Sequence, residues 1–371
     1  MDWNHGAACH ALAAGLWRVA EPSLVPEPRE TAKAAGLRHT TDDEPGITRR
    51  RRGRGWSYHL ADGSLVDDPE ERERIEALAI PPAWTDVWIR PHPDCHLQAT
   101  GRDDRDRKQY RYHPAWQEAS GELKFTRLAA FGHALPRIRR GVREALATEG
   151  LNRERVLATV LALLEKTAIR VGNDEYAREN DTYGLTTLRR RHVTVRGSRI
   201  VFEFEAKGGQ DVEIEVKDER LAPIVAACSE TPGYEIFKWI DPDGERRDVK
   251  SGDVNDFLFE LAEEHVSAKD FRTWLGTLHA FCQLCGCDEP ADEAEIEAQA
   301  LAAVDAVAEL LRNTREVARD AYVHPVLLEL HRAGSLRSRW PKEGRGAASD
   351  DLSPAEAALL ALLDDVNGSA D

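Results

Sequence analysis

The spacing of hydrophobic positions changes along the chain, and its first part predicts strands. Over residues 46–112, apolar and polar positions alternate in short runs such as Val87–Ile89 and Lys108–Tyr112, with turn-forming residues between them. A period of two is typical of strands with one buried face. The charged segment Glu70–Ala79 predicts one helix among them, because the prolines at 81–82 stop it. We therefore expect a small sheet-rich domain here.

Beyond Pro114 the hydrophobic positions take the spacing of helices. Apolar residues recur every three or four positions between Leu157 and Ala168, which places Arg170 just past the end of a helix and before Gly172. The same spacing predicts later helices over residues 254–264, 271–281 and 291–311. This part of the chain should be mainly helical.

Three alternating runs interrupt the helical pattern. They are His192–Val195, Arg199–Glu205 and Val212–Val216. The residues between the last two, Ala206–Gln210, contain two glycines and predict a hairpin turn. Lys207 should therefore lie at the tip of a hairpin.

These patterns predict an α+β fold, with a small sheet-rich N-terminal domain and a mainly α-helical domain that carries a small β-hairpin sheet. The proline-containing residues 1–44 read as an N-terminal extension, and the last residues as an acidic tail. The predicted boundaries are 1–44 for the extension, 45–118 for the sheet-rich domain, 119–345 for the helical domain and 346–371 for the tail.

Composition is that of a globular protein, and 42% of the 371 residues are hydrophobic. The six cysteines come without a secretory signal, which indicates a reduced, cytoplasmic location. No apolar stretch reaches the length of a membrane span. We expect no membrane association.

Net charge is −16, which by itself opposes binding to a polyanion. The charges are unevenly distributed, however. Acidic residues concentrate late, at Asp288–Glu297 and after Asp350, whereas arginines gather early, at Arg49–Arg52 and Arg102–Arg111. The protein can therefore still present one basic face.

Five scattered residues form a set suited to phosphodiester cleavage. They are Arg170, Lys207, Arg272, Asn313 and Tyr322. A tyrosine oxygen can attack phosphorus, guanidinium groups can hold the transition state, and a lysine can protonate the departing sugar oxygen. Such a set requires no metal and no other cofactor.

The sequence around these residues resembles the bacterial, poxvirus-like type IB DNA topoisomerases over roughly residues 45–340. The segments that carry the resemblance are Leu164–Asn173, Tyr183–Leu188, Lys269–Trp274 and Ala321–Pro325, in the order of the family. The resemblance implies Tyr322 as the nucleophile, Arg170 and Arg272 as phosphate clamps, Lys207 as the general acid and Asn313 as a donor to a phosphate oxygen. The chain departs from the family where Ala206 and Gly208 flank Lys207, since glycine and serine are usual there.

The resemblance also implies how the enzyme works. A monomer would clamp duplex DNA between its two domains, cut one strand through a 3′-phosphotyrosyl bond and reseal it without ATP or metal. It would act at the nucleoid. Strand Lys108–Tyr112 resembles the DNA-contacting strand of the family, so Gln109, Tyr110 and Tyr112 are expected to contact DNA. The alternative is a core strand with exposed polar residues.

Other interpretations remain open from the sequence. Asn313 could cap a helix, because Glu316 stands at the third position after it. A second set, His279, Cys282, Cys285 and Cys287, could bind zinc, or it could simply continue the helix of Arg272. For the whole protein, the alternatives are a tyrosine recombinase, although Lys269 stands where such enzymes usually have histidine, and a non-catalytic DNA-binding protein.

Overall fold

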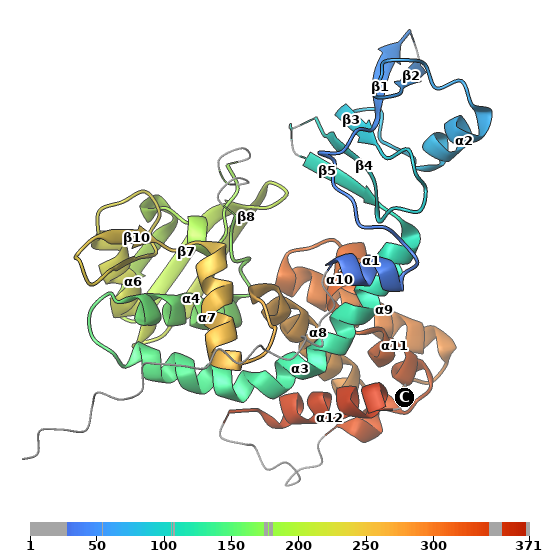
Figure 1. Ribbon diagram of the computed structural model, residues 1–371. Helices are drawn as coiled ribbons and strands as arrows, with labels where there is room; N and C mark the ends of the chain where they lie inside the picture. The colour runs from blue at the N-terminus through green and yellow to red at the C-terminus, as the bar shows by residue number, and fades with distance from the viewer. Residues whose placement is uncertain are drawn as a thin grey trace, which may run out of the picture.

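The computed structural model describes residues 28–340, except 54, 105, 107, 174–176 and 178–180, together with residues 351–368. Two parts of the molecule are joined by one long helix, α3 (Pro114–Leu146) (Figure 1). The first part is built on a sheet, and the second consists mostly of helices. Helices and small sheets occur together, so the predicted α+β class is confirmed.

The first part contains a five-stranded antiparallel sheet, here called the N-terminal sheet. Its spatial order is β2 (Gly55–His59), β1 (Ile47–Arg52), β3 (Thr85–Ile89), β4 (Leu97–Arg102) and β5 (Lys108–Tyr112). Helix α2 (Pro69–Ala77) begins at Asp68, whose carboxylate accepts a hydrogen bond from the amide of Glu70 at 3.1 Å. The apolar residues that alternate along the strands form a separate small core under this sheet.

Gly101 shows why one position of this sheet cannot carry a side chain. A Cβ at Gly101 would lie 2.8 Å from the ring of Trp84 and 3.2 Å from Val87. Without a side chain, the backbone of β4 lets Trp84 close the small core, where it is 9% exposed. A substitution at Gly101 should therefore disturb the N-terminal sheet.

Residues before the sheet also pack against it. After α1 (Pro28–Ala34), Arg38 forms an isolated bridge with Cys95, and the ring of His39 stacks on His96 at 4.4 Å. The amide of Thr40 donates to Nδ1 of His96 at 3.2 Å. The sheet-rich part thus includes contacts from residues 38–40, and the exact boundaries given above remain predictions.

The second part is organised around one large core. Its helices include α4 (Arg153–Thr167), α6 (Leu221–Glu230), α7 (Ser251–Ala262), α8 (Ala268–Gly286), α9 (Glu293–Leu311), α10 (Arg315–Tyr322) and α11 (Pro325–Arg332). Short 3-10 turns are η1 (Leu185–Thr187), η2 (Arg190–His192) and η3 (Leu336–Arg339), and a small strand pair is β9 (Lys238–Ile240) with β10 (Arg246–Asp248). The three helices predicted over residues 254–311 are present, with somewhat different ends.

The predicted hairpin is confirmed as part of a three-stranded sheet of β6 (Val193–Arg196), β7 (Arg199–Ala206) and β8 (Gln210–Lys217). Ala206 pairs with Gln210, so residues 207–209 form the turn. Gly208 and Gly209 have φ of +95° and +74°, a conformation that favours glycine. The turn therefore needs the two glycines that follow Lys207.

Near its end, the chain forms α12 (Pro354–Gly368), which packs on α3 and α8 and buries Leu359 and Leu363. The carboxylate of Glu356 pairs with Arg139 of α3 at 2.7 Å and accepts from Nε1 of Trp274 at 3.4 Å. This stretch, which lies in the predicted acidic tail, contributes to the large core. In the described part of the chain, no helix is long and apolar enough to cross a membrane.

Candidate active site

Arg170 follows the end of α4 within a loop whose backbone is held on both sides. Ala168 caps α4 in the left-handed conformation, with φ of 53°, and turns the chain away from the helix axis. The amide of Leu185 donates to the carbonyl of Arg170 at 2.9 Å. A Cβ at Gly184 would lie 2.6 Å from this carbonyl and from Gly172 Cα, so only glycine permits the approach. The family-like segments around Arg170 and Gly184 therefore form one rigid loop pair.

Arg272 is the buried centre of the site, with 5% of its surface exposed. It lies in the second turn of α8, and its guanidinium donates to the carbonyl of Ala168 and, at 2.8 Å, to the carbonyl of Leu311. These carbonyls belong to the ends of α4 and α9. Arg272 therefore fixes two helix ends relative to α8 while its charge remains at the site.

Asn313 lies between α9 and α10, and its side chain does not cap a helix. The cap of α10 is Thr314, whose hydroxyl accepts from the amide of Val317 at 3.3 Å. The cap interpretation of Asn313 is wrong because the helix begins one residue later than that interpretation required. Its Oδ1 instead accepts from Nη2 of Arg170 at 2.7 Å. Its Nδ2 is buried and has no hydrogen-bond partner in the described part of the chain, so this amide nitrogen can donate to a ligand.

Tyr322 is the last residue of α10 and is 8% exposed. Its carbonyl accepts from the hydroxyl of Thr277 on α8 at 3.0 Å, and its ring centre lies 5.1 Å from the guanidinium carbon of Arg272. A Cβ at Gly276 would lie 2.8 Å from this carbonyl, so the two helices touch only because residue 276 has no side chain. Close packing therefore fixes the orientation of the Tyr322 ring.

The electrostatic surroundings make Tyr322 easier to deprotonate than a free tyrosine. Burial alone would raise the pKa of its hydroxyl, but the charge and hydrogen bond of Arg272 outweigh burial, and the charges of Arg170 and Lys269 add to the effect. The pKa is therefore held below its ordinary value. A phenolate is the stronger nucleophile, so the environment suits the predicted role.

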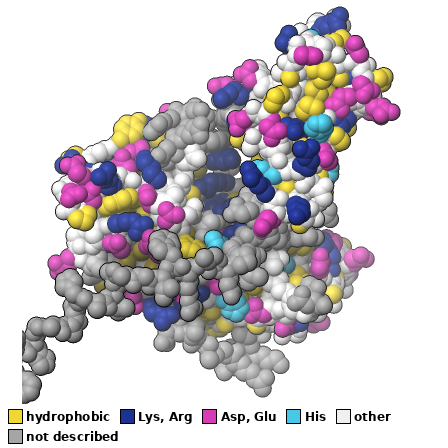
Figure 2. All heavy atoms as spheres, viewed as in Figure 1, with side chains coloured by type: hydrophobic (Ala, Val, Ile, Leu, Met, Phe, Trp, Pro, Cys, Tyr) yellow, Lys and Arg dark blue, Asp and Glu magenta, His cyan; other side chains and the backbone are white. Residues whose placement is uncertain are grey.

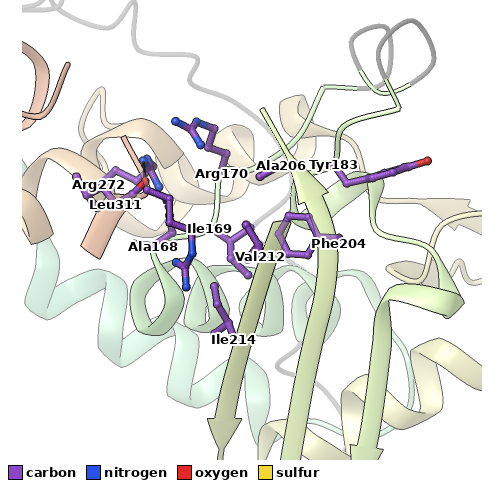
Figure 3. A pocket seen from close by; sticks show the side chains of 11 residues that line it. Ala168, Ile169, Arg170, Tyr183, Phe204, Ala206, Val212, Ile214, Arg272 and Leu311 are labelled. Carbon is purple, nitrogen blue, oxygen red and sulfur yellow. Dashed lines mark hydrogen bonds between the residues drawn. The ribbon is translucent and has the colours of Figure 1, made fainter. Parts of the chain in front are cut away.

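Figure 3 shows a pocket that Arg170 and Arg272 line together with Ala206 at the end of β7. Arg170 projects between Arg272 and the end of β7 at Ala206, whereas Tyr183 points away from them. Lys207 comes directly after Ala206 and is exposed. The structure thus brings the turn that carries Lys207 to the same side of the pocket as Arg170. The roles of the five residues remain predictions.

The predicted DNA-contacting strand is β5, at the edge of the N-terminal sheet. Tyr110 and Tyr112 are 46% and 38% exposed, and their rings stack at 5.9 Å. Because all but one residue of β5 is exposed, the core-strand alternative is wrong. Gln109 points to the opposite face, where its Nε2 donates to Asp103 at 2.9 Å. The structure therefore pairs the two tyrosines and leaves Gln109 apart from them.

The cysteines near Arg272 do not form a metal-binding group. His279, Cys282 and Cys285 follow one another along α8, and Cys287 caps its end. Among the described residues, no three His, Cys, Asp or Glu side chains are grouped as metal ligands would be. Burial raises the pKa of the Cys285 thiol to about 12, which opposes the thiolate form that zinc binds.

Two residues beside Tyr322 were missed from the sequence. Lys124 of α3 donates from Nζ to the carbonyl of Ala321, and Thr277 holds the carbonyl of Tyr322. Lys124 stands 197 positions before Ala321, so no local spacing could relate them. Thr277 could not be found from its spacing either, because it lies five residues after Arg272, outside the i, i+3 and i, i+4 spacings that share a helix face.

Comparison with known proteins shows the family of the chain. The family model for the catalytic core of eukaryotic DNA topoisomerase I matches residues 113–332. The chain belongs to this topoisomerase family. The model for the N-terminal domain of bacterial DNA topoisomerase IB matches residues 55–103, which include most of the N-terminal sheet. The resemblance to type IB DNA topoisomerases predicted from the sequence is thereby confirmed.

Individual topoisomerases show how far the similarity extends. DNA topoisomerase 1B of Acanthamoeba polyphaga mimivirus is 29% identical over 293 residues, which cover 77% of this chain and 87% of the viral protein. DNA topoisomerase 1B of vaccinia virus (strain Copenhagen) is 27% identical over 165 residues, or 42% of this chain and 52% of that protein. DNA topoisomerase 1 of Schizosaccharomyces pombe is 31% identical over 142 residues, or 37% and 16% of the two chains.

Proposed function

We propose that this type IB DNA topoisomerase relaxes supercoiled duplex DNA through a transient covalent bond between Tyr322 and a 3′ phosphate. One observation carries the proposal. Tyr322, Arg272, Arg170 and Asn313 come from separate elements and converge with positive charge, a lowered tyrosine pKa and one unpaired amide donor. In-line attack on a phosphodiester requires a nucleophilic oxygen and groups that stabilise the negative charge on the phosphate oxygens, and these residues can supply both.

In the proposed reaction, the Tyr322 oxygen loses its proton to water and attacks phosphorus. The bond between phosphorus and the 5′ oxygen breaks, and Lys207 gives a proton to that oxygen. Arg170 and Arg272 hold the non-bridging oxygens, and Nδ2 of Asn313 donates to one of them. Religation reverses the same steps. The phosphotyrosyl bond conserves the energy of the broken linkage, so no nucleotide is needed for resealing.

DNA would lie in the hollow between the two parts of the molecule. Figure 2 shows lysine and arginine side chains gathered in this hollow, between the N-terminal sheet and the lobe that contains β7, β8 and β10. Local positive charge there can attract the DNA backbone although the whole chain has a net charge of −16. We propose a monomer that closes around the duplex, with Tyr110 and Tyr112 contacting the backbone. Action on chromosomal DNA would place the enzyme at the nucleoid, in the cytoplasm.

Relaxation of a supercoiled plasmid that lacks any recombination site should proceed in excess EDTA and without ATP. Two guanidinium groups supply the positive charge at the phosphate that a metal ion supplies in other enzymes. The assay follows topoisomers on a gel, and a magnesium-containing reaction is the control. Loss of all activity in EDTA that magnesium restores would contradict the mechanism. Dependence on a specific DNA site would favour the recombinase alternative.

Replacing Asn313 by alanine should slow single-turnover cleavage by about 10²-fold, the usual effect of removing one donor to a developing charge. Thr314→Ala is the matched control. It removes the cap of α10, so it should lower the free energy of unfolding by about 1 kcal/mol while it slows cleavage much less. Equal slowing in the two variants would mean that Asn313 acts only through the local fold.

A further inference from the structure

Lys124 lies on α3 where this helix passes the end of α10. Its Nζ donates to the carbonyl of Ala321, the residue before the nucleophile, and lies 5.5 Å from the centre of the Tyr322 ring. The same ammonium lies 4.5 Å from the ring of Phe125. Lys124 is thus in contact with the backbone that leads into Tyr322 and lies over the face of its side chain.

Lys124 supplies a hydrogen bond to a backbone carbonyl at the C-terminal end of α10. The helix has eight residues, and the last carbonyl groups of any α-helix have no hydrogen-bond partner within the helix. Lys124, on α3, donates a hydrogen bond to the carbonyl of Ala321. Thr277, on α8, donates one to the carbonyl of Tyr322 at 3.0 Å. A cation at a helix C-terminus also interacts favourably with the helix dipole. The end of α10 is therefore anchored from two different helices.

Holding a cation here is unfavourable for Lys124 itself. Burial lowers its pKa to about 8; Lys269 of α8 lowers it too, while Asp270 of α8 and Asp320 of α10 act in the opposite direction. The nearby His324 adds no second positive charge, because burial and the charge of Lys124 lower the pKa of His324 to about 4. Among the described carboxylates, none forms an ion pair with Lys124. A neutral residue would pack here at less cost, which suggests that the charge has a use.

Helix α3 links the Lys124 contact to the N-terminal sheet. It begins two residues after β5, with His113 as its cap, and β5 carries Tyr110 and Tyr112. Lys124 is ten residues along the helix from Pro114, or about 15 Å. One continuous helix therefore connects the strand proposed to contact DNA with the backbone of the proposed nucleophile (Figure 1).

We propose that Lys124 is a positioning residue for the nucleophile: it fixes the end of α10 against α3, so that the Tyr322 ring is oriented by the helix that carries the N-terminal sheet. This inference rests on the proposed role of Tyr322. Lys124 acts through the backbone and the ring face and transfers no proton. Its effect should therefore be on the rates of both cleavage and religation, because the two reactions share one transition state.

The test compares Lys124→Met with Lys124→Arg in single-turnover cleavage of a short duplex and in religation. Met keeps most of the length of the side chain and removes its charge, and we expect both rate constants to fall by about 10²-fold, the effect of a misplacement near 1 Å. The final amount of cleaved DNA, the cleavage equilibrium and DNA affinity should stay unchanged. Lys124→Arg should recover most of the rate, since a guanidinium can still reach the carbonyl.

Several outcomes would overturn the inference. A wild-type rate constant in Lys124→Met would do so, and so would an unchanged rate constant with less DNA cleaved, which indicates only a loss of folded enzyme. A defect that disappears on a substrate with sulfur at the bridging 5′ position would make Lys124 a proton donor instead. The proposed function fails separately: if Tyr322→Phe still formed the covalent adduct, the nucleophile itself would be wrong, whatever the rate of Lys124→Met.

Discussion

Tyr322→Phe should form no covalent adduct with DNA and should relax no plasmid, while it binds duplex DNA as the wild type does. The substitution removes one oxygen atom and leaves the ring in its place beside Arg272, where the ring centre is 5.1 Å from the guanidinium carbon. The reaction has no other route in this account, because the oxygen forms the bond to phosphorus. Relaxation gels, adduct gels after denaturation and binding titrations measure the three properties.

Each part of this result has a separate meaning. Preserved binding shows that the loss is chemical, and an unchanged unfolding transition shows that the ring still packs. A second tyrosine variant, Tyr234→Phe, serves as the control, because Tyr234 is 62% exposed and has no proposed role in catalysis or DNA contact, so this variant should keep its ability to form the adduct. Adduct formed by purified Tyr322→Phe would remove Tyr322 from its proposed role.

Lys207→Ala should slow cleavage of ordinary DNA by about 10² to 10⁴-fold. The 5′ oxygen leaves poorly as an alkoxide near neutral pH, and Lys207, on the exposed turn beside the pocket, is the proposed source of its proton. A substrate with sulfur at this bridging position removes the need, because a thiolate leaves without a proton. On that substrate the variant should be nearly as fast as the wild type. The measurement is single-turnover cleavage of the two substrates.

Arg170→Ala is the matched control for Lys207→Ala. Its guanidinium is proposed to hold the phosphate rather than to donate a proton, so this variant should stay slow on both substrates. Equal defects of Lys207→Ala on the oxygen and sulfur substrates would assign Lys207 to phosphate binding or to the shape of the turn. The comparison therefore distinguishes the two roles without reference to the size of either defect.

Local patterns in the sequence were enough to predict much of the fold. Alternation around the two glycines after Lys207 located the β7–β8 turn, because a three-residue turn with positive φ leaves few other choices. The helical period up to Ala168 placed Arg170 just past α4. What the pattern missed there was the left-handed cap at Ala168, which is held by tertiary contacts such as the hydrogen bond from Arg272.

Other features depend on contacts between distant residues and could not be predicted in this way. Asn313 and Thr314 are both good cap residues, and the packing of Asn313 against Arg170 decides which of them caps α10. The acidic residues after Pro354 indicated a tail, whereas the leucines that α12 buries have their partners in the distant helices α3 and α8. The hydrogen bond from Lys124 to the carbonyl of Ala321 joins residues 197 positions apart, and the sequence around neither residue predicts it.

The proposed role of Tyr322 is tested by identifying the residue that becomes attached to DNA. Wild-type protein is incubated with supercoiled plasmid, denatured and digested with trypsin and nuclease, and the nucleotide-bearing peptide is sequenced by mass spectrometry. Cleavage after Arg319 and Arg332 should release residues 320–332, in which Tyr322 is the only tyrosine of the seven in the chain. We expect this peptide to carry the nucleotide through a 3′ phosphate on Tyr322. A nucleotide on any other residue, or linkage through a 5′ phosphate, would contradict it.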